Sequence, residues 1–183
     1  AVPVGALLSY SLGADKERFI TGLSEALDRF ELPLLGGDTV SSNGPRHFGM
    51  TAIGRASHTP VPSRSGARSG DAVYVTGAVG AAMLGFEALR DQTGADSSLF
   101  RRPIPLIEQG RLLAPFVSAI MDVSDGLLLD ASRIAAASGV SVNIDPASVP
   151  LAADEDRRMD ALRWGDDYQL LFTADQAVSL PVE

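Results

Sequence analysis

The sequence predicts a mixed α/β protein, of the α+β kind, divided into two domains that are each incomplete. In the second half of the chain, short apolar runs typical of strands alternate with segments whose apolar residues have helical spacing. Between the two halves, residues 57–70 are rich in Ser, Pro, Gly and Arg, a composition typical of domain connections. The expected division is an N-terminal domain over 1–57, a linker over 58–70 and a C-terminal α/β domain over 71–183.

The first half is expected to contain one helix and two strands. Apolar side chains recur at helical spacing over residues 19–30, with Asp15 as the expected N-cap and Pro33 as the residue that ends the helix. Residues 34–35 are expected to form a short strand that leads into a loop, and residues 47–56 a second strand.

The second half is expected to alternate strands and helices, and Gly139 is a natural C-terminal stop for its last long helix. The expected strands are 72–75, 140–144, 168–172 and a short one that ends at residue 122. The expected helices are 81–90, 105–114 and 127–138. The expected irregular segments are a loop over 92–102 and a mobile, charged surface stretch over 154–160.

Carboxylates stand beside glycine in three short motifs, each of which we expect in a loop at the end of an apolar run. The motifs are Gly36-Gly37-Asp38-Thr39, Asp122-Val123-Ser124-Asp125-Gly126 and Gly165-Asp166-Asp167-Tyr168. In a chain with no cysteine and 2 histidines, carboxylates suit Mg²⁺ rather than zinc or copper. Because Mg²⁺ held by a few carboxylates usually takes phosphate as a further ligand, the motifs predict phosphate chemistry.

Each motif alone also has a simpler interpretation. Gly-Asp pairs are common in ordinary turns, and adjacent acids before a strand are often only a solvated turn. Ser124 and Asp125 could cap the helix that follows them, although a helix N-terminus also attracts phosphate. A plain structural α/β module would need all three motifs to be coincidental.

Composition excludes several other classes of protein. The formal net charge of −8 argues against binding to a nucleic-acid backbone or to an anionic membrane. No apolar run approaches the length of a membrane span, and the absence of cysteine fits a reducing cytoplasm. Neither a G-x-x-x-x-G-K-[ST] phosphate loop nor a G-x-S-x-G serine elbow occurs. The chain begins at Ala1 without Met, so we expect it to be a fragment.

In chain order, the motifs and their neighbours resemble the thiamine-monophosphate kinase family, a branch of the aminoimidazole ribonucleotide synthetase-like superfamily. The matching segments are 36–39, 51–54, 64–67 with 70–71, 73–77, 122–127, and 165–168 with 170–172. The resemblance implies transfer of the ATP γ-phosphate to thiamine monophosphate, which gives thiamine diphosphate. It also implies several Mg²⁺ ions, a homodimer, and an N-terminal domain that binds ATP and Mg²⁺ and forms the dimer. No catalytic side chain is expected, because such transfer depends on positioning and charge neutralisation.

The resemblance also implies roles for individual residues. The implied Mg²⁺ ligands are Asp38, Asp122 and Asp125; the implied ATP contacts are Gly37, Asp38, Arg64 and Ser124; the implied contact with the thiamine substrate is Asp166.

Some positions depart from the family pattern. The family usually has glycine at Trp164, an acid at Gln169 and often arginine at Leu106. Its N-terminal Gly-Asp-Asp-Ala-Ala motif and a C-terminal segment that helps to enclose the thiamine ring do not occur in this chain. Two further hypotheses therefore remain: another ATP-dependent synthetase of the superfamily, or a truncated chain that binds nucleotide without turnover.

Overall fold

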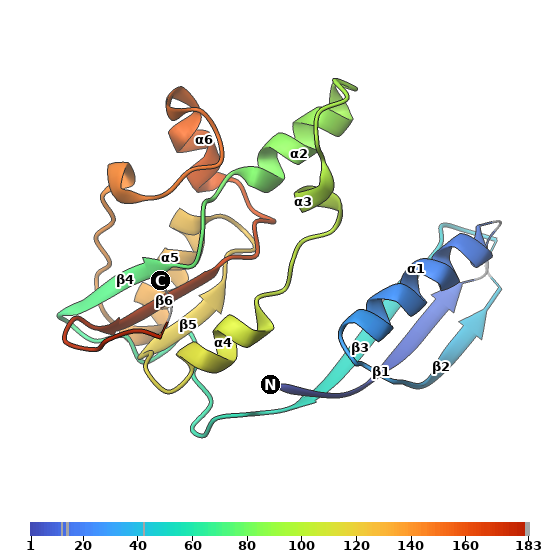
Figure 1. The fold of residues 1–183 in the computed structure, drawn as a ribbon, viewed down its shortest axis with the longest axis horizontal. Helices are drawn as coiled ribbons and strands as arrows, with labels where there is room; N and C mark the ends of the chain where they lie inside the picture. Colours follow the sequence, from blue (N-terminus) through green and yellow to red (C-terminus); the bar gives the residue numbers. More distant parts are fainter. Residues whose placement is uncertain (12, 14, 42, 182–183) are drawn as a thin grey trace. The chain divides into compact units, whose positions relative to one another are not determined.

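The computed structural model describes residues 1–11, 13, 15–41 and 43–181, which form two compact units (Figure 1). The first unit comprises Ala1–Ser57 and the second His58–Glu183, and each has its own three-stranded sheet. Among the described residues, no helix has both the length and the apolar character needed to cross a bilayer. The fold is of the expected α+β class, with helices and strands in both units.

The first unit is a β-α-β arrangement with one added strand. Strand β1 (Val2–Ser11) is central, with β2 (Leu34–Val40) parallel to it on one side and β3 (Phe48–Arg55) antiparallel on the other. Helix α1 (Lys16–Arg29) connects β1 to β2, as a parallel pair requires. Helix α1 and strand β3 lie where the sequence predicts them, β2 extends well beyond the predicted strand at residues 34–35, and β1 was not assigned from the sequence.

An aromatic cluster joins α1 to the sheet. Phe19 of α1 stacks on Tyr10 of β1 and packs against Phe48 of β3, with both pairs of ring centroids 4.8 Å apart. Offset and tilted aromatic pairs of this kind add stabilisation beyond the area that they bury. Asp15 is the N-cap residue of α1, as expected, but its side chain makes no capping hydrogen bond.

The first acidic motif lies inside β2, so the prediction that it occupies a loop was wrong. Gly37 and Asp38 stand opposite Leu8 and Ser9 of β1 in the parallel ladder. A Cβ atom on Gly37 would lie 1.8 Å from the carbonyl oxygen of Leu8, so only glycine permits this approach. Gly-Asp pairs are common in turns, and β1 was not assigned from the sequence, so the residues alone favoured a loop.

The second unit has the strand order β4-β6-β5. Strand β6 (Leu170–Asp175) is central and antiparallel to both β4 (Asp71–Val75) and β5 (Ala119–Asp122). Phe172 is paired with Tyr74 in one direction and with Ile120 in the other. The central strand is therefore the one that directly follows the third acidic motif, and its neighbour β5 ends at the second.

Five α-helices and two 3₁₀ helices complete the described part of this unit. They are α2 (Ala81–Arg90), α3 (Ser98–Arg101), α4 (Ile107–Leu113), α5 (Leu127–Ser138), α6 (Arg158–Arg163), η1 (Pro146–Ser148) and η2 (Glu155–Arg157). The bounds of α2 and α5 agree with the sequence prediction, and Gly139 ends α5 in the left-handed conformation (φ 67°). Leu127 and Ile134 of α5 are buried with Leu171 of β6, which fixes the helix in the core.

Three segments differ from the sequence prediction. Residues 140–144 form no strand; their alternating apolar side chains pack against the core without joining a ladder. The segment 92–102, expected as a loop, contains the short helix α3. The stretch 154–160, expected to be a mobile surface segment, forms η2 and the start of α6, and Arg157 is ion-paired with Glu87 of α2 at 2.9 Å.

The Pro- and Ser-rich segment 58–70 makes specific contacts with the second unit. The backbone N–H of Ile120 donates to the carbonyl of Ser63 at 2.8 Å. The hydroxyl of Ser138 accepts from the N–H groups of Gly66 and Ala67, each at 3.1 Å. These bonds attach the segment to β5 and to the end of α5, and its role as a linker stays a prediction.

Candidate functional site

The second and third acidic motifs are joined by backbone hydrogen bonds in the second unit. The N–H of Asp166 donates to the carbonyl of Ser124 at 3.0 Å, and the N–H of Tyr168 donates to the carbonyl of Val123 at 2.9 Å. In return, the N–H of Val123 donates to the carbonyl of Gln169 at 2.8 Å. The loops that follow β5 and precede β6 therefore form one structure, because their adjoining strands are neighbours in the sheet.

Two glycines permit the close approach of these loops. A Cβ atom on Gly165 would lie 2.2 Å from the carbonyl oxygen of Ser124. Gly126 has a φ of 110°, and a Cβ atom there would lie 2.5 Å from the carbonyl oxygen of Arg163. Since both obstacles are backbone atoms, they cannot move aside as a flexible side chain could. The glycines of these motifs thus have a steric function that is independent of any ligand.

Carboxylates of the second and third motifs affect the pKa of the Tyr168 hydroxyl. This hydroxyl donates to Asp166 Oδ1 at 3.2 Å. Burial raises the pKa of Tyr168, and the negative charges of Asp166, Asp122 and Asp125 raise it further, because all three disfavour a phenolate. Asp122, Asp125 and Asp166, which come from two separate motifs, therefore lie near enough to one hydroxyl for their charges to act on it, and we call these three residues the acid cluster.

Two of the four described residues other than glycine that have a positive φ lie in the third acidic motif. Asp166 and Tyr168 have φ values of 63° and 51°, in the left-handed region that residues other than glycine rarely adopt. Such conformations cost about 1–3 kcal/mol each and cluster at functional sites. The hydrogen bonds to Val123 and Ser124 hold both residues in this conformation.

Asp167 differs from its neighbour Asp166 because its carboxylate points into the unit. Its oxygens accept from the N–H groups of Gly80 at 2.7 Å and of Ala82 at 3.0 Å, at the start of α2. Burial raises the pKa of Asp167, while the hydrogen bonds from these N–H groups oppose that effect. Asp167 is thus an anchor for α2, and only Asp166 of the adjacent acids contributes to the cluster.

The sequence analysis missed Asp130, which supports the second motif from within α5. Its side chain has no exposed surface, and its Oδ2 accepts from the N–H groups of Ser124 and Asp125, both at 3.0 Å. An acid between Leu127 and Ile134 on the apolar face of a predicted helix was the available signal. A carboxylate at such a position needs a specific partner.

The remaining candidate residues lie elsewhere. Gly37 and Asp38 belong to β2 of the first unit, where every residue of the strand is exposed. Arg64 is exposed in the segment 58–70, and its carbonyl accepts from the hydroxyl of Ser138 at 3.3 Å. Of the candidates, then, the structure gathers Ser124 and the acids of the second and third motifs within one unit.

The donor chemistry of the gathered acids suits Mg²⁺. Within the part of the chain that the structure describes, no three Asp, Glu, His or Cys side chains are arranged as a ready metal cage. Mg²⁺ does not need such a cage, because it is usually held by one or two carboxylates together with water and phosphate oxygens. Asp122 and Asp125 are both exposed and provide oxygen ligands of this kind at the end of β5 and in the loop that follows it, so the residues present fit the ion.

A pocket of about 140 Å³ adjoins the acid cluster on the side of Asp166. Its walls are mainly apolar and come from the start of α2 and from the segment around α3. The lining residues are Ala81, Ala82, Leu99, Pro103, Ile104, Leu106, Asp166, Asp167 and Gln169. A small apolar pocket with a carboxylate at its edge can hold an organic ring that carries positive charge.

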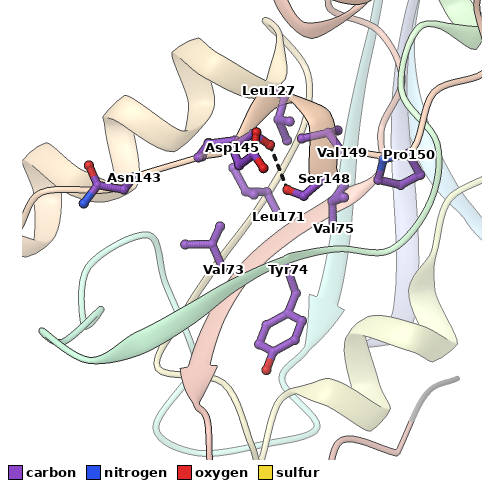
Figure 2. A pocket seen from close by; sticks show the side chains of 11 residues that line it. Val73, Tyr74, Val75, Leu127, Asn143, Asp145, Ser148, Val149, Pro150 and Leu171 are labelled. Carbon is purple, nitrogen blue, oxygen red and sulfur yellow. Dashed lines mark hydrogen bonds between the residues drawn. The ribbon is translucent and has the colours of Figure 1, made fainter. Parts of the chain in front are cut away.

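A second cavity, of about 310 Å³, lies between β4 and the segment that contains η1 (Figure 2). Two of its polar side chains are used locally: Asp145 caps η1 by accepting from Ala147, and the Ser148 hydroxyl donates to the Asp145 carbonyl at 2.7 Å. No carboxylate of the acidic motifs lines it. The cavity is therefore separate from the candidate site.

The chain is similar to thiamine-monophosphate kinases. It is 34% identical over 177 residues to the enzyme of Caulobacter vibrioides, an alignment that covers 88% of this chain and 50% of that protein. The crystal structure of the enzyme from Stenotrophomonas maltophilia superposes with a TM-score of 0.84 at 33% identity, over 96% of this chain and 62% of that one.

A further solved structure, of AaThiL complexed with AMPPCP and TMP, superposes with a TM-score of 0.78 at 28% identity. That match covers 96% of this chain and 62% of the other. The chain thus spans about half the length of the curated relatives that it matches.

Two family models cover almost the whole chain. The model for the N-terminal domain of AIR synthase related protein matches residues 1–56. The model for the C-terminal domain of the same family matches residues 68–180. Since the second match alone covers more than half of the chain, this protein belongs to the AIR synthase related family.

Proposed function

We propose that this chain is part of an ATP- and Mg²⁺-dependent kinase that converts thiamine monophosphate to thiamine diphosphate. The observation that carries the proposal is the cluster of Asp122, Asp125 and Asp166, which lies at the end of β5 and in two loops that hydrogen-bond to each other. The similarity to named thiamine-monophosphate kinases supports the choice of substrate. A relative solved with AMPPCP and TMP supports ATP as the phosphate donor.

The chemistry of this transfer suits a site built from carboxylates. The acceptor is a phosphate monoester whose second pKa is about 6, so it is already largely ionised near neutral pH and needs no general base. The main obstacle is repulsion between two polyanions, which bound Mg²⁺ would relieve by neutralising phosphate oxygens. In this proposal Asp122 and Asp125 hold Mg²⁺ in the second unit, and the Ser124 hydroxyl contacts ATP.

The proposal also gives roles in nucleotide binding to three residues outside the cluster. Asp38 would be a further Mg²⁺ ligand that also contacts ATP, and Gly37 would let the β2 backbone approach the nucleotide. Arg64 would pair with a phosphate group, since a guanidinium can bind phosphate through two parallel hydrogen bonds. All three residues are exposed and so are available to a ligand.

The thiamine substrate would occupy the side of the cluster where Asp166 lies. The thiazolium ring of thiamine carries a positive charge, which the Asp166 carboxylate would stabilise. The apolar walls of the adjoining pocket, with Leu99, Ile104 and Leu106, would exclude water from the ring face.

The first unit has features that support a homodimer. Strands β2 and β3 are exposed at every residue and carry large apolar side chains, among them Leu35, Phe48 and Met50. Apolar surface of this kind is commonly buried in subunit interfaces. Light scattering coupled to size-exclusion chromatography should give twice the mass of the monomer.

The direct test is formation of thiamine diphosphate from thiamine monophosphate and ATP, with and without Mg²⁺. Product that depends on Mg²⁺ is expected. A folded sample that binds ATP but leaves thiamine monophosphate unchanged would overturn the proposal for this chain. Turnover of ATP with an amide-containing acceptor instead would favour another synthetase of the superfamily.

A further inference from the structure

One buried carboxylate accepts hydrogen bonds from the backbone of the second acidic motif. Asp130, in the first turn of α5, accepts through Oδ2 from the N–H groups of Ser124 and Asp125 and through Oδ1 from Nη1 of Arg133 at 2.7 Å. Its side chain is 0% exposed. A helix cap needs one acceptor for one N–H group, so a buried acid with three donors does more than cap α5.

Arg133 extends this network to the acid cluster. It lies one turn after Asp130 on α5, is 37% exposed, and its Nη1 contacts Oδ2 of Asp125 as well as Oδ1 of Asp130. Asp125 is 53% exposed, and among the described residues its Oδ1 has no hydrogen-bond partner. A single guanidinium nitrogen therefore binds one oxygen of Asp125 and leaves the other without a hydrogen bond to the described residues.

We propose that Asp130 and Arg133 are positioning residues for the proposed metal site. Asp130 fixes the loop backbone, and Arg133 turns the Asp125 carboxylate so that Oδ1 is presented to Mg²⁺. The inference rests on the proposed function only in taking Asp125 as a metal ligand. Ligating carboxylates are commonly held by hydrogen bonds from a second layer of residues, and loss of such a partner typically costs 10–100-fold in metal affinity.

The pair orients Asp125 without adding net charge near it, because Asp130 and Arg133 carry opposite charges. Loss of both charges together should therefore change the orientation of Asp125 more than the local potential. Loss of Arg133 alone would leave a buried carboxylate without its counter-charge, which is strongly destabilising. A charge-balanced double substitution is thus the appropriate variant.

The test compares two double variants with the same change of charge. In Asp130→Asn with Arg133→Met, the amide oxygen of Asn can still accept from the loop N–H groups, while the bridge to Asp125 is lost. The matched control is Glu108→Gln with Arg111→Met on α4, an exposed pair with the same i,i+3 spacing, 2.9 Å apart. A third variant, Arg133→Lys, keeps a positive charge beside Asp130 but shortens the side chain.

The measurement is Mg²⁺ affinity in the presence of ATP, by calorimetry and by fluorescence of Trp164, which is the only tryptophan and directly precedes Gly165. We expect about 10-fold weaker Mg²⁺ binding for the α5 double variant and several-fold weaker binding for Arg133→Lys. The control should bind as the wild type does.

Three outcomes separate this inference from the proposed function. If wild type binds Mg²⁺, Asp122→Asn weakens that binding and Arg133→Lys does not, the inference is overturned while the proposed function stands. If the α5 double variant fails to fold, Arg133→Lys decides the question. If wild type neither binds Mg²⁺ nor forms product, both proposals are wrong.

Discussion

Asp38 lies in the middle of β2, whereas Asp122 is the last residue of β5, and Asp125 and Asp166 lie in two loops that hydrogen-bond to each other. Parallel pairing of β2 with β1 fixes the position of Asp38, and every residue of β2 is exposed. In the second unit, Asp122 is paired with Leu170 at the end of β5, whereas hydrogen bonds of the two loops hold Asp125 and Asp166. The same residue type is thus fixed by sheet pairing alone in the first unit and by sheet pairing together with loop contacts in the second.

The two units differ equally in their cores. Among the described residues of the first unit, only Gly5, Ala6, Tyr10 and Ser11 are buried. The second unit has a continuous core in which α5 packs on β5 and β6. The second unit can therefore hold its acids by itself, whereas the first buries little apolar area of its own that could stabilise it.

Removal of a metal-binding carboxylate should have the largest effect in either unit. Asp122→Asn and Asp38→Asn should each lower kcat by about 100-fold or more, because about 3 kcal/mol of transition-state stabilisation depends on correctly bound metal. Both side chains are exposed, so thermal stability should change little. Asp28→Asn, the same change at an exposed position on α1, is the control. Near-normal turnover by folded Asp122→Asn would remove that residue from the metal site.

Substitution of the loop glycine tests whether the second unit holds its own site. Gly165→Ala should lower the free energy of unfolding by about 2–3 kcal/mol, because the new Cβ atom would collide with the backbone of Ser124. Gly22→Ala on α1, where nothing lies within 4 Å, should instead stabilise the first unit by about 0.5–1 kcal/mol. Urea unfolding followed by Trp164 fluorescence and by circular dichroism checks both. Equal stability of wild type and Gly165→Ala would contradict the packing of the two loops.

The sequence predicted the elements that depend on local signals. Helices α2 and α5 were assigned with their observed bounds, because apolar periodicity and Gly139 are readable in one stretch of chain. Strand β1 and the strand conformation of Gly37 and Asp38 were not predicted. Both result from pairing between segments some 30 residues apart, and Gly-Gly-Asp alone is typical of a turn.

The candidate site was predictable in its composition but not in its division of roles. The three motifs identified the acids, and the family resemblance implied a role for each. The sequence could not separate Asp166 from Asp167, since the difference depends on which carboxylate reaches the start of α2. It also could not show that Asp130 faces the preceding loop, although an acid on an apolar helix face was a signal that a partner existed.

Asp166 allows the substrate side of the second unit to be tested separately from the metal side. Asp166→Asn should raise the KM for thiamine monophosphate by about 10-fold and leave the KM for ATP nearly unchanged, because the charge facing the thiazolium is lost. Asn tolerates the left-handed conformation of this residue, whereas Asp166→Ala should show the same shift in KM together with some loss of stability. If only the affinity for ATP changed in both variants, the assignment of this side of the site would be wrong.

The smallest expected effect concerns the ion pair between α2 and η2, a support of the second unit. Arg157 donates to both carboxylate oxygens of Glu87, at 2.9 and 3.3 Å, and this lowers the pKa of Glu87 below its usual value. A carboxylate whose pKa is lower in the folded state stabilises the fold above its unfolded pKa of about 4.3, and this contribution is lost as the pH falls through the folded pKa.

Glu87→Gln should therefore lower Tm by roughly 1–3 °C at pH 7 and by less below about pH 4. Thermal melts followed by Trp164 fluorescence would check this. If the difference in Tm between wild type and Glu87→Gln grew as the pH fell, Arg157 would not stabilise the charged form of Glu87. The contact between α2 and η2 would then depend on packing and backbone hydrogen bonds alone.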